Sequence, residues 1–280
     1  MNIRSKKYRN IFIVFIVIAA ILFLSFKCNQ TIYRSVEING KIMKAQVRGS
    51  GDKTIVMLSG WGVDSPIDDF YPIYEELIKD YKVVVLEYFG YFGSDVTDEE
   101  RTNEKMVEEI RTALDKLDIK PPYILMPHSM SGLYSLYYAN KYPSEVSAII
   151  GLDMSLPQKQ LERWNEETFE KTKQENANRK LNISVMNQWN AFYDNSKELE
   201  NVKYPSGLPV LNFLATEQIN SMDDMIKSGE IKTTWLDMNR NMITNPKIQT
   251  IEILNGSHNN LMYEQTDKIL EFSEKFIESL

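Results

Sequence analysis

The 280-residue sequence predicts an α/β fold in which a mostly parallel sheet is flanked by helices. Short apolar runs of the buried-strand type alternate with segments whose apolar residues recur at helical spacing, which is typical of parallel sheets. A hydrophobic content of 43% over this length is enough for one large domain with a substantial core. The charge is also divided, because a basic N-terminal segment precedes an acidic body.

The body begins with a predicted hairpin. Residues 34–49 ("RSVEINGKIMKAQVRG") contain two strand-like runs around Asn39-Gly40, a dipeptide typical of two-residue hairpin turns. Six more runs have the composition of buried strands: residues 53–58, 82–88, 122–126, 146–152, 208–215 and 247–254. Helices are expected at residues 68–80, 99–117 and 131–142, and an amphipathic helix from residue 262 onward.

Residues 156–206 interrupt this alternation. They form a long, polar, helix-like stretch between two predicted strands, with scattered aromatic residues (Trp164, Phe169, Trp189, Phe192 and Tyr193). We predict an inserted helical lid over the strand ends. The alternative for this stretch is a surface excursion.

The N-terminal segment is strongly apolar. Residues 11–26 ("IFIVFIVIAAILFLSF") carry no charge, and as a helix they would rise about 24 Å, slightly less than a bilayer core of roughly 30 Å. Four basic residues precede them, which favours a cytoplasmic N-terminus. We predict that residues 1–30 are an uncleaved, single-pass membrane anchor and that residues 31–280 form an extracytoplasmic domain.

A cleaved signal peptide is the alternative for this segment. A small-x-small cleavage site should then follow the apolar run, but Phe26 and Lys27 stand there. Lys27 also argues against a lipoprotein anchor on Cys28, since small residues are expected just before such a cysteine. Cys28 is the only cysteine of the chain, so no internal disulfide can form.

The charge of the body limits its partners. Removing the five basic residues of the first 30 leaves 27 basic residues against 39 acidic ones, a net charge of about −12. Such a body repels phosphate backbones, so nucleic-acid binding is not expected.

The stretch "YILMPHSMSG", residues 123–132, places a serine directly after a predicted strand and before a predicted helix. A nucleophile elbow needs small residues two positions before and two after its serine, as in G-x-S-x-G. Ser129 fits better than Ser131, because Ser131 as nucleophile would put Leu133 in the tight turn. Pro127 departs from the pattern, since proline fixes φ and lacks a donor at the end of a central strand.

A serine nucleophile needs a base, and the chain has only two histidines. His128 precedes Ser129 along the strand, and we expect its side chain to point away from the serine. His258 follows the last predicted strand, from where it can reach the elbow. The order of serine first and histidine last suits this architecture.

The loop "LSGWG", residues 58–62, follows the first predicted parallel strand. Its glycines would let the backbone approach a substrate, so we assign the oxyanion-binding N–H groups to Trp61 and Met130. The alternative for this loop is a simple glycine turn.

With these motifs the chain resembles the α/β-hydrolase superfamily from about residue 35 to its end. Residues 121–153 are similar to the stretch of those enzymes that runs from the nucleophile strand through the elbow to the next strand. "LSGWG" is similar to their HGxG oxyanion loop, with Ser59 in place of the histidine, and "EYFGYFGSD" to a later turn. The resemblance implies an α/β-hydrolase fold and attack of Ser129 on an acyl carbonyl, with His258 as base and an acyl-enzyme intermediate.

The acid of the triad has two candidates. Most relatives carry it after the penultimate strand, where this chain has only Glu217 as an early carboxylate. Asp153 ends the strand that follows the elbow, and some α/β-hydrolases that resemble this stretch carry the acid there. We predict Asp153, with Glu217 left open; a helix cap at the entry to the lid is the alternative role for Asp153.

We therefore predict a membrane-anchored serine hydrolase that cleaves a small-molecule ester or amide outside the cytoplasmic membrane, with no cofactor and no metal ion. An aminopeptidase or lyase on the same scaffold is one alternative. A non-catalytic binding protein of this fold is another, and the presence of both Ser129 and His258 argues against it. The fold itself does not indicate the substrate, because it hosts many reactions.

Overall fold

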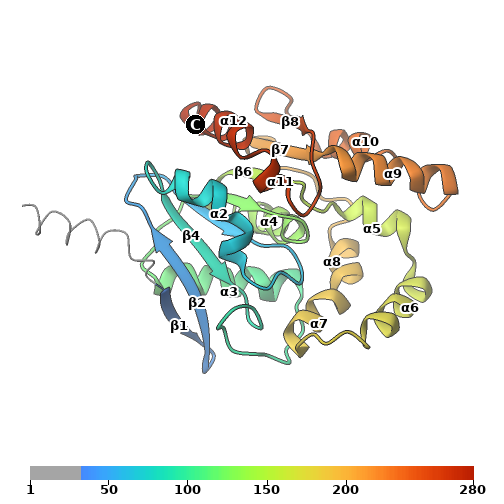
Figure 1. Cartoon of the computed structure of the whole chain (residues 1–280), viewed down its shortest axis with the longest axis horizontal. Coiled ribbons are helices and arrows are strands. Elements are labelled where there is room, and N and C mark those ends of the chain that lie inside the picture. Colours follow the sequence, from blue (N-terminus) through green and yellow to red (C-terminus); the bar gives the residue numbers. More distant parts are fainter. Residues whose placement is uncertain (1–32) are drawn as a thin grey trace, which may run out of the picture. The chain divides into compact units, whose positions relative to one another are not determined.

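The computed structural model describes residues 33–280, which contain the whole predicted sheet. The sheet has eight strands in the order β1-β2-β4-β3-β5-β6-β7-β8. Their bounds are β1 Tyr33–Ile38, β2 Lys41–Arg48, β3 Thr54–Leu58, β4 Lys82–Glu87, β5 Tyr123–Pro127, β6 Val146–Leu152, β7 Val210–Ala215 and β8 Gln249–Leu254. β1 and β2 form an antiparallel hairpin, and β3 to β8 run parallel (Figure 1). The predicted mostly parallel sheet is confirmed.

The central strands are buried on both faces, which explains their continuous apolar sequences. In β3, Ile55 and Met57 pack into one hydrophobic cluster while Val56 and Leu58 pack into the other. This alternation follows from the two-residue period of a strand. The sheet therefore has two cores, one on each face.

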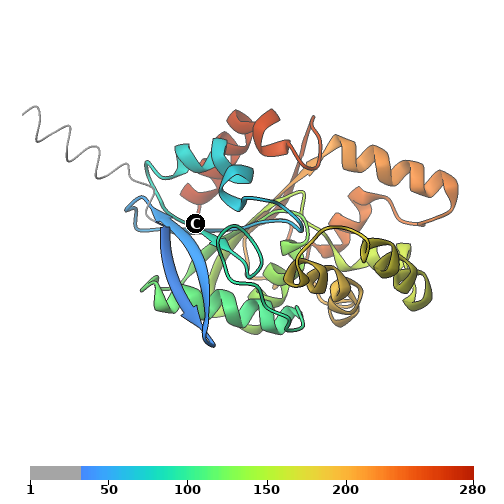
Figure 2. The same ribbon diagram turned by 60° about the horizontal axis from the view of Figure 1, so that its bottom comes forward.

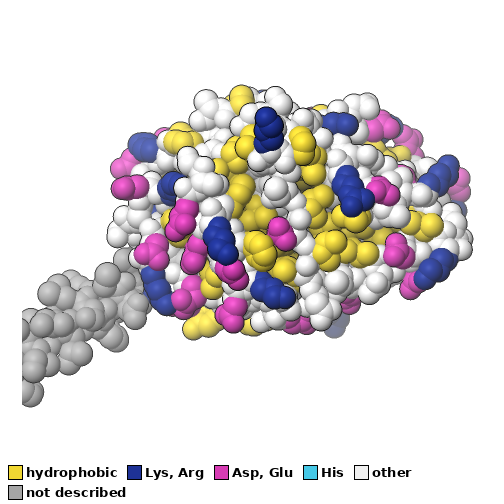
Figure 3. Space-filling view, turned by 90° about the horizontal axis from the view of Figure 1, so that it is seen from above, with side chains coloured by type: hydrophobic (Ala, Val, Ile, Leu, Met, Phe, Trp, Pro, Cys, Tyr) yellow, Lys and Arg dark blue, Asp and Glu magenta, His cyan; other side chains and the backbone are white. Residues whose placement is uncertain are grey.

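Helices cover both cores. α2 (Pro66–Leu77), α11 (Leu261–Glu264) and α12 (Thr266–Glu278) contact one another on one face. α3 (Asn103–Lys116) and α4 (Ser131–Lys141) pack together on the opposite face (Figure 1). Seen from the α12 side, hydrophobic side chains gather in the middle of the surface and charged ones lie mainly around them (Figure 3). The last helix, predicted as one element from residue 262, is broken into α11 and α12.

The lid predicted at residues 156–206 is helical. It consists of α5 (Pro157–Arg163), α6 (Glu166–Asn176), α7 (Ile183–Asn190) and α8 (Phe192–Glu198), all between β6 and β7. Two helices that the sequence analysis left out, α9 (Thr216–Ser228) and α10 (Trp235–Met242), lie between β7 and β8. The lid helices lie together beside α9 and α10 (Figures 1 and 2).

The predicted membrane anchor, residues 1–30, lies outside the residues that the structure describes. Within residues 33–280, no helix combines the length and the apolar character that crossing a bilayer requires.

Candidate active site

Ser129 stands on a tight turn between β5 and α4. Its φ is +50°, in the left-handed region that a non-glycine residue seldom adopts. The turn is held in place by hydrogen bonds to the Ser129 carbonyl, from the N–H of Gly132 at 3.0 Å and of Ser155 at 2.7 Å. Backbone strain of this kind persists only where the surroundings fix it, and it is concentrated at functional sites. The geometry is that of a nucleophile elbow.

The turn tolerates Pro127 because of its position in β5. Pro127 is the last residue of the strand, opposite Leu58 of β3, and the next residue supplies the hydrogen bond that proline cannot make. The N–H of His128 donates to the carbonyl of Leu58 at 2.9 Å. The departure from G-x-S-x-G therefore leaves the elbow intact.

The small residues after Ser129 are packed against their neighbours. The hydroxyl of Ser131 is buried and bonds to the Tyr88 hydroxyl at 2.8 Å and to the carbonyl of Ser59. A Cβ on Gly132 would lie 2.7 Å from both the Met154 Cβ and the Ser155 carbonyl oxygen. The start of α4 therefore has no room for a larger side chain.

We expect Gly132→Ala to lower the free energy of unfolding by about 1–3 kcal/mol, because the added methyl group must displace backbone. Gly207→Ala is the matched control, since a Cβ there would meet nothing within 4 Å. Urea denaturation of both variants measures the difference. Equal unfolding midpoints would contradict the tight packing at the elbow.

His258 lies between Ser129 and Asp153. Its Nε2 is 3.0 Å from the Ser129 Oγ, and its Nδ1 is 2.6 Å from the Asp153 Oδ2. A carboxylate can only accept, so Nδ1 carries the proton and Nε2 is free to accept the serine proton. The structure thus brings three of the predicted residues into one chain of hydrogen bonds with the geometry of a serine–histidine–acid triad.

Asp153 is held rigidly. It follows β6, has φ +43° and is 1% exposed. Its second oxygen, Oδ1, accepts from the Ala215 N–H and from the Trp235 indole N–H, both at 3.3 Å. The Trp235 ring also contacts the Lys159 ammonium at 5.3 Å, and burial lowers the pKa of that lysine to about 8, although the charge of Asp153 opposes the shift.

Glu217 lies at the beginning of α9 and makes no hydrogen bond to the imidazole ring of His258, whose nitrogens face Asp153 and Ser129. Its Oε2 instead accepts from the backbone N–H of His258 at 2.7 Å. Glu217 therefore positions the loop that carries His258, and Asp153 is the carboxylate at Nδ1.

The expectation that His128 points away from the serine is wrong. His128 is 2% exposed, lines the same pocket as Ser129, and its ring centroid lies 5.1 Å from that of His258. Its Nε2 donates to the His258 carbonyl at 3.0 Å, and its Nδ1 is 3.3 Å from the Asp69 Oδ2. The elbow's left-handed turn accounts for the error, because it breaks the strand alternation on which the expectation rested.

The glycine loop lies directly against the elbow. A Cβ on Gly60 would be 3.0 Å from the Ser129 Cβ and 3.2 Å from the His128 Nδ1, so only glycine allows this approach without displacement. Within residues 33–280, the backbone N–H groups of Trp61 and Met130 donate no hydrogen bond. Neither N–H is therefore satisfied within the described domain; Trp61 lines the pocket at Ser129, and Met130 is 2% exposed.

A pocket of about 660 Å³ opens at Ser129. Its wall combines the glycine loop, the start of α2, the lid and the loop after β8, and the lining includes Asp64, Asp68, Asp69, Arg179 and Tyr263. Within the described domain, this pocket included, no group of three or more His, Cys, Asp or Glu side chains is arranged to hold a metal ion. The serine therefore lies at the wall of a cavity lined by both polar and apolar side chains.

The family model of the alpha/beta hydrolase fold matches residues 53–266, and the chain belongs to this family. A hydrolase is the class of enzyme that the fold and the family define. The "Uncharacterized protein YbdG" of Bacillus subtilis (strain 168) is 42% identical over 123 residues, which are 44% of this chain and 38% of YbdG. The matched part of the chain therefore spans well under half the length of that curated relative.

Two solved structures share the fold at low sequence identity. A bacterial membrane phospholipase A is 15% identical, with 98% of each chain covered and a TM-score of 0.60. A mutant of a putative epoxide hydrolase from Pseudomonas aeruginosa is 13% identical, with 89% of this chain and 95% of that chain covered and a TM-score of 0.68. At these identities the likeness shows the fold alone.

Proposed function

We propose that this hydrolase cleaves an ester or small amide through an acyl-enzyme on Ser129. The observation that carries the proposal is the hydrogen-bonded chain from Ser129 through His258 to the buried carboxylate of Asp153. The glycine loop supports it, because it lies against Ser129 and its Trp61 N–H bonds to no other described group.

In the proposed reaction, the Ser129 Oγ attacks the acyl carbon while the His258 Nε2 takes its proton. The N–H groups of Trp61 and Met130 bind the oxyanion of the tetrahedral intermediate. The imidazolium, stabilised by Asp153, then gives its proton to the leaving group, which departs and leaves the acyl-enzyme. Water, deprotonated by His258, attacks the acyl carbon, and the second intermediate collapses to the acid and free Ser129.

The nucleophile argues against epoxide hydrolysis. Opening an epoxide with the Ser129 oxygen would form an ether, which has no carbonyl carbon for water to attack. The enzyme could not then turn over. An acyl group on the same oxygen is an ester, which the His258-activated water can hydrolyse.

The substrate proposal follows from the pocket. Most of its lining residues are polar or glycine, and its apolar surface comes mainly from Trp61, Val63, Leu181 and the ring of Tyr263, which lie on separate segments. We expect p-nitrophenyl acetate and butyrate to be hydrolysed with a higher kcat/KM than the decanoate, because a long acyl chain would remain in water. A preference that rises steadily with chain length would contradict this expectation.

An aminopeptidase is the second candidate. Three aspartates line the pocket (Asp64, Asp68 and Asp69), and a free α-amino group is cationic. Aminoacyl p-nitroanilides and their N-acetylated forms separate the two candidates. Cleavage that requires the free amine would support an aminopeptidase, and equal or faster cleavage of the acetylated forms would support the esterase.

We also propose that residues 11–26 anchor the protein in the membrane with its catalytic domain outside. The basis is the uncharged apolar run behind four basic residues. Protease added to intact spheroplasts should digest the domain while a cytoplasmic marker protein survives. A mature soluble form that begins near residues 28–35 would contradict the anchor.

A further inference from the structure

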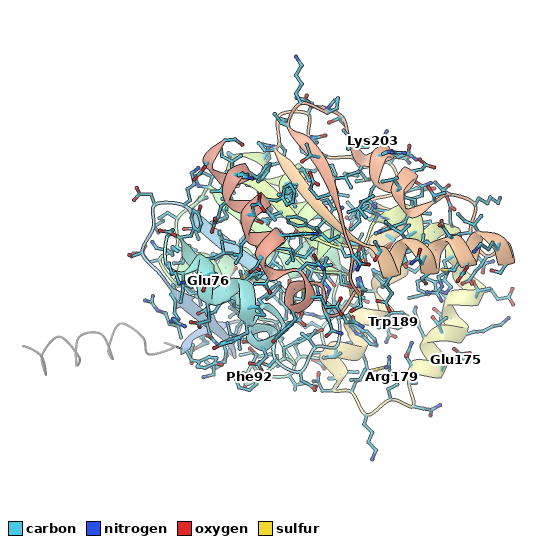
Figure 4. The ribbon with its side chains drawn as sticks, turned by 45° about the horizontal axis from the view of Figure 1, so that its top comes forward. Glu76, Phe92, Glu175, Arg179, Trp189 and Lys203 are labelled. Carbon is cyan, nitrogen blue, oxygen red and sulfur yellow. The ribbon has the colours of Figure 1, made fainter. Side chains whose placement is uncertain are left out.

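The Trp61 side chain connects the glycine loop, residues 58–62, to helix α7 of the lid. Its indole Nε1–H donates to the Val185 carbonyl of α7 at 2.8 Å. Its ring packs on Trp189 of the same helix with centroids 4.8 Å apart, and the Arg179 guanidinium lies 5.2 Å from its centroid. Figure 4 labels Arg179 and Trp189 on the lid. The residue that offers a backbone N–H to the oxyanion is thus held by its side chain to α7.

A second connection joins the same loop to the same helix. The N–H of Gly62 donates to the buried Tyr91 hydroxyl at 3.0 Å, and that hydroxyl donates to the Gln188 Oε1 of α7. Val185, Gln188 and Trp189 are neighbours on successive turns, so one helix holds both the Trp61 side chain and the peptide group that follows Trp61.

α7 is itself fixed to the body of the domain. The Ser184 hydroxyl accepts from the Thr97 N–H at 2.7 Å and donates to the Thr97 carbonyl at 2.8 Å. Asn182 donates to the Gly90 carbonyl at 2.6 Å. A Cβ on Gly90 would lie 2.5 Å from both the Asn182 Oδ1 and the Ser184 Cβ, so helix and loop are in close contact. This end of the lid is a fixed wall of the site.

We propose that α7 is a fixed support of the oxyanion-binding loop and that Trp61, through its side chain, is a positioning residue for its own backbone N–H. The inference rests on the proposed acyl-enzyme reaction. An oxyanion donor must be aimed at the position that the oxyanion will occupy, and a displacement near 1 Å can cost about 100-fold in rate. A loop of two glycines within five residues has little stiffness of its own.

The test compares Trp61→Phe with Trp164→Phe. The first variant keeps an aromatic ring on Trp189 but loses the hydrogen bond to Val185. The control removes the same atoms from Trp164, whose ring centroid lies 5.8 Å from that of Trp189 and whose other ring contacts are Phe169, Phe192 and Arg163, none of them in the glycine loop. We expect Trp61→Phe to lower kcat for p-nitrophenyl acetate about tenfold with KM changed less than about twofold, since only transition-state binding is lost. Trp164→Phe should stay within about twofold of wild type.

Ser184→Ala extends the test to the support of α7. Ser184 bonds to Thr97 and lies outside the glycine loop and the pocket lining. We nevertheless expect Ser184→Ala to lower kcat more than Trp164→Phe does. If Trp61→Phe does not fold, as judged by near-UV circular dichroism, Tyr91→Phe replaces it, because it removes the second connection and leaves the aromatic cluster in place.

The rate of inactivation by a fluorophosphonate separates the two levels of the proposal. If the wild-type protein is not labelled, both the proposed serine hydrolase function and this inference are wrong. If the wild-type protein is labelled, the proposed function is supported, and the two variants then test the inference. The inference requires that Trp61→Phe is labelled more slowly than Trp164→Phe. Equal rates, or a loss that lies in KM alone, would overturn it.

Discussion

Ser129→Ala should reduce kcat by about 10⁶, the loss expected when a serine hydrolase loses its nucleophile. The Ser129 Oγ is the atom that lies 3.0 Å from the His258 Nε2, and the elbow presents it to the pocket. Any turnover that remains would come from the oxyanion donors and substrate binding alone. Ester hydrolysis by the purified variant, corrected for the uncatalysed rate, measures the effect.

Ser131→Ala is the matched control, two residues away in the same turn. Alanine fits the position, which demands a small side chain. The Tyr88 hydroxyl and the Ser59 carbonyl would lose a buried partner, so we expect a loss of stability of about 1–3 kcal/mol with only a modest loss of kcat. Equal losses of kcat in the two variants would mean that the elbow has been misassigned.

Asp153→Asn should cut kcat by roughly 10⁴ while the protein stays folded. The Asp153 Oδ2 accepts the proton on the His258 Nδ1 at 2.6 Å, and it therefore selects the tautomer whose Nε2 can act as a base. An asparagine can turn its amide N–H toward Nδ1, and the imidazole then places its proton on Nε2, facing the serine. The pH-rate profile and kcat of the variant test this, with its melting temperature as a check of folding.

Glu217→Gln is the control for the acid. The glutamine oxygen can still accept from the backbone N–H of His258, as Glu217 does at 2.7 Å, so we expect less than about a tenfold loss. If Glu217→Gln loses most of its kcat and Asp153→Asn remains active, the triad acid has been assigned to the wrong strand.

The sheet was predictable because buried parallel strands carry short, continuous apolar sequences. The runs "TIVML" and "VSAIIGL" each predict a strand, and in the structure they are the buried strands β3 and β6. Residues that follow parallel strands lie at the same edge of the sheet. For this reason His258 could be predicted to lie near Ser129, 129 positions earlier in the chain. The catalytic role of Asp153 stays a prediction, although its geometry at the imidazole favours it over Glu217.

Contacts between distant segments were not predictable. The bond from Trp235 to Asp153 spans 82 positions, and α10, which carries Trp235, is only eight residues long. The Trp61 side chain meets α7 over 124 positions, and its indole could equally have pointed into the pocket. Local sequence patterns determine the helices and strands, but these contacts depend on how the lid and the segment between β7 and β8 pack against the rest of the domain.

Labelling with a fluorophosphonate probe tests the central claim most directly. A serine activated as proposed attacks the probe's phosphorus, and fluoride leaves, so the tag remains on the attacking oxygen. We predict that wild type takes up one tag, that peptide mass spectrometry places it on Ser129, and that Ser129→Ala takes up none. A folded wild-type protein that stays untagged, or a tag on Ser131, would contradict the claim that Ser129 is the nucleophile of a hydrolase.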